Sequence, residues 1–168
     1  MLKHPLFLKW WLFMSMTLLA VVYLISDGWL TIVWEKDATK LSFLLMFIFT
    51  IMSAWCGYKT WKLSKFLDNG QTGTYLVEKI EHLMEVGWFT SDLCLSVGMM
   101  GTVIGFIMML SGFTNINTQD ISTVQNLIKS LGVGMSTALY TTLIGLACST
   151  LLKIQYFNLS QAIDKARK

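Results

Sequence analysis

The sequence predicts an all-α integral membrane protein that crosses the bilayer four times. Hydrophobic residues make up 54% of the 168 residues and charged residues only 14%, whereas soluble domains carry about 25% charged residues. Four apolar stretches contain no charged residue, and they cover about 10–26, 41–58, 93–113 and 131–152. Each is close to the length of about 20 residues that spans the hydrocarbon core as a helix.

The first stretch, 10–26, follows a short basic start and contains no small-residue cleavage site, so we interpret it as a retained span and not as a signal peptide. The residues that follow, 27–40, are expected to form a short loop with a net negative charge. Aromatic residues flank the second stretch, 41–58, as they do at membrane interfaces. The first two spans are rich in bulky side chains and are expected to face lipid.

A polar segment, 59–92, separates the second and third spans and begins with Lys59, Lys62 and Lys65 on one face of a continuing helix. It is expected to be helical, with a break at Asn69-Gly70. The loop 114–130 is nearly neutral. It is expected to end in a short helix capped near Asp120.

The lysine distribution predicts the orientation. The N-terminus, the 59–92 segment and the C-terminal tail are lysine-rich, and the other two connections are acidic or nearly neutral. Positive residues favour the cytoplasmic side, so both termini and the 59–92 segment are expected in the cytoplasm. The expected parts are a peripheral hairpin 1–58, a cytoplasmic segment 59–92, a pore-lining hairpin 93–153 and a cytoplasmic tail 154–168.

Several classes of function are disfavoured by composition. A net charge of +3 is too small to indicate nucleic-acid binding. Cys56, Cys94 and Cys148 lie in or beside apolar stretches without metal-ligand spacing, and we interpret them as small apolar packing residues. We expect no metal site, no cofactor, no catalytic residues and therefore no enzymatic activity in the chain by itself.

The last two spans differ from the first two in their small and hydroxylated residues. Small residues recur every three or four positions, as in closely packed membrane helices: Gly98, Gly101, Gly105, Gly134, Ala138 and Gly145. Hydroxyl groups accompany them at Thr102, Ser136, Thr137, Tyr140, Thr141 and Thr142. These hydroxyls either bond to carbonyls of their own helix, which is the commoner role, or line a hydrated ion path.

No Asp, Glu, Lys, Arg or His lies inside any of the four stretches, and Asp92 and Lys153 stand at the edges of the last two. Ion-coupled membrane proteins use an ionisable group within the membrane. The chain therefore either moves no ions or receives the ionisable group from a partner.

Two motifs resemble those of the MotA/TolQ/ExbB proton-channel family. Residues 98–105 read GMMGTVIG, similar to the family's G-x-x-G-T-V-x-G, and residues 134–146 read GMSTALYTTLIGL, similar to G-I-x-x-A-L-x-x-T-x-x-G-L. The Tyr156-Phe157-Asn158 end is similar to the Y-N that follows the last span in the family. The resemblance covers about 93–158.

The resemblance implies a pentameric ring around a dimeric, single-span partner of the MotB/TolR/ExbD type that carries one membrane Asp. Thr102 and Thr142 match the motif threonines and would line the path of protons, or of sodium ions, past that Asp. Such a partner would account for the missing acid. The resemblance also implies a place in the inner membrane of a bacterium, where the motor would convert the proton-motive force into mechanical work; the process it drives stays open.

The main alternative is a structural or pore-forming four-span oligomer, similar to a scaffold or a phage holin, without ion coupling. Co-purification of a small single-span protein with a membrane Asp would distinguish the motor subunit from this alternative.

Overall fold

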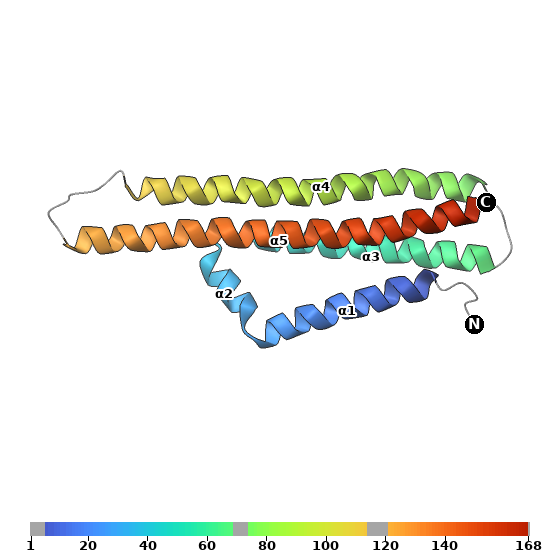
Figure 1. Ribbon diagram of the computed structural model, residues 1–168, viewed down its shortest axis with the longest axis horizontal. Helices are drawn as coiled ribbons and strands as arrows, with labels where there is room; N and C mark the ends of the chain where they lie inside the picture. The colour runs from blue at the N-terminus through green and yellow to red at the C-terminus, as the bar shows by residue number, and fades with distance from the viewer. Residues whose placement is uncertain (1–5, 69–73, 114–120, 168) are drawn as a thin grey trace.

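The computed structural model describes residues 6–68, 74–113 and 121–167, which are helical apart from short turns. The described residues form α1 (Leu6–Ser26), α2 (Trp29–Lys36), α3 (Leu41–Asp68), α4 (Thr74–Ser111) and α5 (Ile121–Arg167), shown in Figure 1. The prediction of an all-helical chain is confirmed for this part of the sequence.

Three helices are long and apolar enough to cross a membrane, and the stretches concerned are Leu41–Lys62, Met84–Ser111 and Val124–Gln161. In α1 the apolar stretch Trp10–Tyr23 is shorter. The length and apolar composition of these helices are those of a membrane protein. That the chain crosses the membrane four times stays a prediction.

The residues 27–40 do not form a simple loop, and this expectation was wrong. Gly28 turns the chain with a left-handed φ of 75°, which glycine adopts without a steric penalty. The apolar run that follows then forms α2, with Val33 buried and Trp34 exposed. Only Asp37 to Lys40 remain as the turn into α3, because the apolar residues before them have a helical face to bury.

The long helices extend beyond the apolar stretches. α3 continues through Lys59, Lys62 and Lys65 to Asp68, as their spacing predicts. Instead of a separate short helix after Asp120, the residues from Ile121 onward belong to α5, which has 47 residues without interruption. No proline lies between Ile121 and Arg167 to end this helix. Asn69, Gly70 and Asp120 lie outside the described residues.

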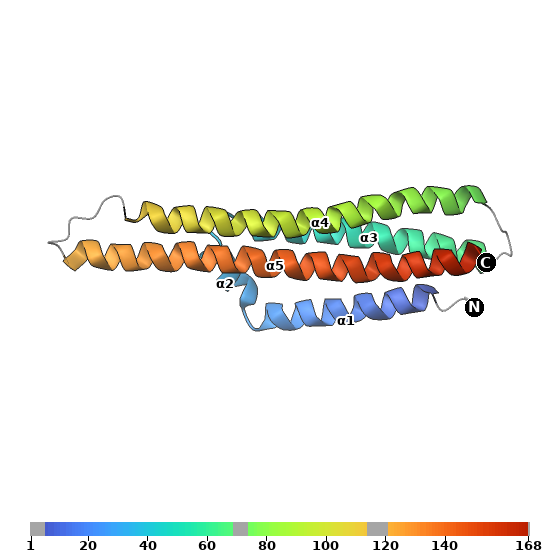
Figure 2. The same ribbon diagram turned by 45° about the horizontal axis from the view of Figure 1, so that its top comes forward.

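The helices pack as layers around α5. In Figures 1 and 2, α4 and α5 lie side by side along most of their length, α3 lies against α5, and α1 lies on the outside. The hydroxyl of Ser53 on α3 donates to Gln155 Oε1 on α5 over 3.0 Å. Trp10 on α1 packs against Gly57 on α3. α3 runs parallel to α5, because Ala38 and Ser53 contact Thr137 and Gln155 in the same order along the two segments. The order of contacts is reversed for α1 against α3 and for α4 against α5, so α1 and α4 run antiparallel to α5.

The core lies where α3, α4 and α5 meet. Its buried side chains include Leu45, Met52, Leu152 and Tyr156. The three cysteines are also buried and unpaired there, which agrees with their interpretation as packing residues. No group of metal-binding side chains was found among the described residues.

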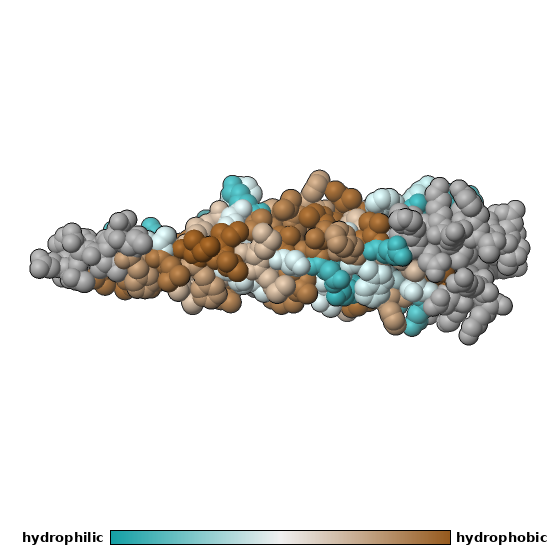
Figure 3. Space-filling model, turned by 90° about the horizontal axis from the view of Figure 1, so that it is seen from above, coloured by the Kyte–Doolittle hydropathy of each residue, from teal (hydrophilic) through white to brown (hydrophobic). Residues whose placement is uncertain are grey.

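Much of the outer surface is apolar. Figure 3 shows a broad hydrophobic area over the middle of the molecule, seen from the side of α4. Large exposed side chains on α4 include Met99, Met100, Val103, Phe106 and Leu110. An apolar surface of this extent suits contact with lipid or with other helices.

Candidate functional site at the crossing of α4 and α5

The contact between α4 and α5 depends on small residues. A Cβ atom added to Gly105 would lie 2.6 Å from the carbonyl oxygen of Gly134 and 2.7 Å from the Cβ of Ala138. A Cβ atom on Gly98 would lie 3.1 Å from the Cα of Gly145. The two backbones therefore approach closely, and all six of the small residues singled out in the sequence lie at or beside this contact.

Thr141 lies inside the contact. Its side chain is fully buried and packs against the backbone of Gly101, which has no side chain to obstruct it. The Thr141 hydroxyl donates to the carbonyls of Thr137 and Ala138 at 2.9 and 3.1 Å. This hydroxyl is thus enclosed within the protomer and bonded to its own helix.

Thr142, the next residue, lies half-buried at the edge of the same contact. Its hydroxyl points to two carbonyls, that of Ala138 on α5 at 2.9 Å and that of Gly98 on α4 at 3.2 Å. Thr102 is also half-buried and donates to the carbonyl of Met99. A hydroxyl has one hydrogen and two lone pairs, so each threonine keeps acceptor capacity for a further partner.

The side of α5 that carries Thr142 faces away from α3. Thr137 and Gln155 contact the turn before α3 and α3 itself, so they mark the side of α5 next to that helix. Five residues after Thr137, at about 100° per residue, Thr142 is turned about 140° from this side. Thr142 therefore borders the surface that α1, α2 and α3 leave open. Thr102 lies on α4 one helical turn after Gly98, whose carbonyl Thr142 contacts.

Thr137 has a role that the sequence did not indicate. It is fully buried, and its hydroxyl donates to the carbonyl of Lys36 at 3.0 Å and accepts from the N–H of Ala38 at 3.3 Å. Those two backbone groups belong to the end of α2 and the turn that follows. The Thr137 side chain thus attaches this turn to α5, a contact between residues about one hundred positions apart.

Asp37 organises the same turn. The residue is only 1% exposed, and its carboxylate accepts from the backbone N–H groups of Thr39, Lys40 and Ser42 at 3.0–3.1 Å. Burial alone would raise the pKa of Asp37, but the hydrogen bonds from Ser42 and Thr39 outweigh it and lower the pKa below its ordinary value. Asp37 is therefore a structural anion that caps the first turn of α3.

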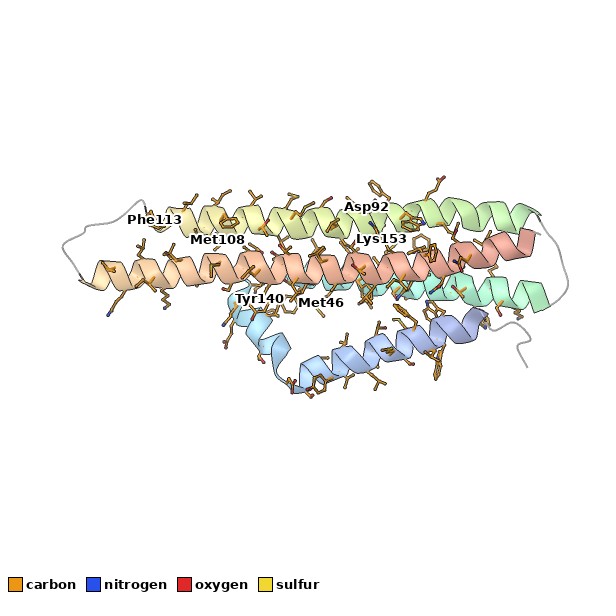
Figure 4. All side chains as sticks on the ribbon, in the orientation of Figure 1. Met46, Asp92, Met108, Phe113, Tyr140 and Lys153 are labelled. Atoms are coloured by element: carbon orange, nitrogen blue, oxygen red, sulfur yellow. The ribbon has the colours of Figure 1, made fainter. Side chains whose placement is uncertain are left out.

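Ser136 and Tyr140, the remaining hydroxyl residues singled out in the sequence, lie elsewhere on α5. Ser136 donates to the carbonyl of Val133 at 3.0 Å and is about half a turn away from Gly134, on the side opposite α4. Tyr140 is half-buried on the side of α5 toward α2 in Figure 4. Within one protomer, the six hydroxyl residues therefore do not line a single path.

An ion pair also joins α4 and α5. Lys153 Nζ lies 2.8 Å from Asp92 Oδ1, and Figure 4 shows the two residues on facing sides of the helices. Both side chains were placed at the edges of spans from the sequence. The structure brings them together on the surface of the protomer.

Comparison with known proteins gives the family. The model of the MotA/TolQ/ExbB proton channel family matches residues 74–168, which hold the whole of α4 and α5 and more than half of the chain. Searches of curated proteins and of solved structures gave no match. Both the matched range and the small-residue crossing lie in the same two helices, and the chain belongs to the MotA/TolQ/ExbB proton channel family.

Proposed function

We propose that the chain is the proton-conducting subunit of a motor in the bacterial inner membrane, which converts the proton-motive force into mechanical work. Membership of the family supports this function. The observation that carries it further is the pair Thr102 and Thr142, with lone pairs available at the open edge of the α4–α5 contact.

The apolar stretches that carry these two threonines, 93–113 and 131–152, contain no carboxylate and no Lys, Arg or His. We therefore assign the proton-carrying carboxylate to a dimeric, single-span partner of the MotB/TolR/ExbD type. A protonated carboxylic acid would donate to Thr142 Oγ1, whose hydrogen points to the carbonyls of Ala138 and Gly98. After the proton leaves, the hydroxyl can rotate and donate to the carboxylate.

A pentameric ring is the assembly that this function requires. The exposed apolar side chains on α4 and α5, such as Val103, Phe106, Leu139 and Leu143, would then be covered by neighbouring copies or by the partner's spans. The helices α1 and α3 would lie toward lipid. The termini and the 59–92 segment would lie in the cytoplasm, where their lysines are favoured.

Replacing Thr142 by Val tests the function, because valine keeps the shape and removes the hydroxyl. A hydrogen bond to a charged group contributes about 1.5–3 kcal/mol, so proton flux should fall at least about tenfold while the ring and its partner still assemble. Flux is measured with a pH-sensitive dye in vesicles that contain the chain and its partner.

The matched control is Thr50→Val. Thr50 is exposed on α3, and its hydroxyl also bonds to its own helix, at the carbonyl of Met46. This variant should conduct as the wild type does. Equal flux in the Thr142 and Thr50 variants would contradict the assigned path.

Purification from native membranes tests the partner. We expect a small protein with one apolar span and a membrane Asp to co-purify, at about two copies for five of this chain. A ring that purifies alone and conducts alone would favour the pore-forming alternative.

A further inference from the structure

The ion pair of Asp92 and Lys153 is not used by the function proposed above. In the protomer the Asp92 side chain is 63% exposed and the Lys153 side chain 39%, on the open surface between α4 and α5 (Figure 4). The exposed residues near the pair include large apolar side chains, Trp88, Phe89 and Phe157. The two charged groups therefore lie among apolar side chains of the kind that contact lipid or other helices.

The register of the helices places this pair beside an uncharged part of α3, which the sequence did not indicate. The hydroxyl of Ser53 on α3 donates to Gln155, and the hydroxyl of Tyr156 donates to the carbonyl of Met52 at 3.4 Å. Residues 155–156 of α5 are thus level with residues 52–53 of α3. Lys153 is then level with about residue 51, near the middle of the uncharged stretch 41–58.

The pair also shares a side of α5 with Thr142. Lys153 follows Thr142 by about three helical turns and lies about 16 Å further along the axis, toward the C-terminal end. It is turned about 160° from Gln155, which contacts α3. Thr142 and Lys153 therefore border the same open surface, one after the other.

Ionisable side chains in apolar surroundings of a membrane protein are costly, and they usually face a water-filled cavity or an ion path. Because α3 lies on the opposite side of α5, the pair faces the place that a neighbouring subunit or the partner would occupy. If Thr102 and Thr142 border the proton path, a proton that leaves them toward the cytoplasm reaches Asp92 and Lys153 next.

We propose that the Asp92–Lys153 pair is the inner gate of the proton path, an inference that depends on the proposed function. While the pair is closed, the ammonium group of Lys153 repels cations and occupies the Asp92 carboxylate. A proton from water in the path binds an Asp92 oxygen as Lys153 moves aside. It then passes to water on the cytoplasmic side, and the ion pair closes again.

Charge variants in the same flux assay test the gate. Asp92→Asn leaves the Lys153 charge without its partner in the path, so proton flux should fall at least about tenfold while the ring and the bound partner are retained. Asp92→Asn combined with Lys153→Gln removes both charges and should restore much of the flux. Lys129→Gln, on the opposite end of α5, is the control and should conduct normally.

Two results would overturn the gate. One is wild-type flux in the Asp92→Asn protein. The other is a loss of flux that occurs only together with loss of the ring, because it would show that the pair holds the helices together. If Thr142→Val abolishes flux and Asp92→Asn does not, the gate alone fails; if Thr142→Val conducts normally, the proposed path itself fails.

A second measurement needs no partner and no flux. Lys153→Cys should react with a membrane-impermeant, positively charged thiol reagent in inside-out vesicles at least about tenfold faster than Ile154→Cys, if position 153 faces water. Ile154 is the next residue and is also exposed. The native cysteines are buried, so the unmodified chain gives the background. Equal rates at the two positions would overturn the gate.

Discussion

Thr141 and Thr142 are neighbours in the sequence, but their hydroxyl groups lie in different surroundings. Thr141 is enclosed against Gly101, whereas Thr142 reaches the edge of the contact and the carbonyl of Gly98. The sequence alone could not separate them, because both lie within the same small-residue pattern. Only the relative rotation of α4 and α5 decides which one is accessible.

This difference predicts that Thr141→Val retains proton flux within about twofold of the wild type. The Thr141 hydroxyl bonds only to carbonyls of its own helix, and valine of the same shape costs little when those carbonyls keep their helical partners. The measurement is the vesicle assay used for Thr142→Val. Loss of flux in a correctly assembled Thr141 variant would place the path inside the protomer instead of at its edge.

Asp37 gives a prediction about pH. Its folded-state pKa is lowered, so the ionised form stabilises the fold above the unfolded-state pKa of about 3.9. This contribution is lost as the pH falls through the folded-state pKa. The melting temperature of the detergent-solubilised chain should therefore fall in the acid range below about pH 4.

The Asp37→Asn variant is the comparison. It should melt lower than the wild type at neutral pH, because the amide is a weaker acceptor for the N–H groups of Thr39, Lys40 and Ser42. The difference in melting temperature between the two proteins should disappear as the pH falls and the wild-type carboxylate becomes protonated. A constant gap from neutral to acid pH would show that the charge of Asp37 does not hold the turn.

At the scale of the helices, the crossing of α4 and α5 gives a test with an internal control. Gly105→Ala places a Cβ atom 2.6 Å from a backbone oxygen of α5. This overpacking should lower the free energy of unfolding by about 1–3 kcal/mol. Gly132 in α5 has open space around it. Gly132→Ala should leave the free energy of unfolding unchanged or raise it by up to about 1 kcal/mol. The free energies of unfolding of the two variants are compared by titration with a denaturing detergent. Equal stabilities would show that α4 and α5 can separate at no cost.

The helices also show how far the sequence could predict the fold. The spacing of Gly98, Gly101 and Gly105 predicts a close contact between the last two spans, because such a pattern is local to one helix. The helix α2 and the attachment of its turn to Thr137 were missed, since they depend on a contact between distant residues. The position of Asp92 and Lys153 beside the uncharged stretch of α3 was missed for the same reason: it follows from the register of α5 against α3.

At the scale of the whole molecule, the two hairpins are displaced along the bundle axis. The uncharged stretch 41–58 of α3 is level with about 140–160 of α5, through the contacts of Ala38 with Thr137 and of Ser53 with Gln155. The uncharged stretch of α5 itself is 131–152. The two apolar bands are therefore offset by about 13 Å, and no single flat bilayer of about 30 Å is centred on both.

The arrangement of α1 gives the last prediction, which concerns the number of spans. α1 is antiparallel to α3, with Trp10 beside Gly57 and Met14 beside Ser53. Its exposed side chains, such as Trp11, Leu12, Met16, Leu18 and Leu19, are apolar, as expected for a helix in lipid. If α1 crosses the membrane, the chain crosses four times and both termini lie on one side.

Reporter domains that are active only outside or only inside the cytoplasm can decide between four and three spans. Fusions before Met1 and after Lys168 should both report the cytoplasm, and an insertion between Asp27 and Gly28 should report the outside. If α1 lay along the surface of the membrane, three spans would place the termini on opposite sides. The fusion after Lys168 serves as the fixed reference, because the last span ends before the lysine-rich tail in either arrangement.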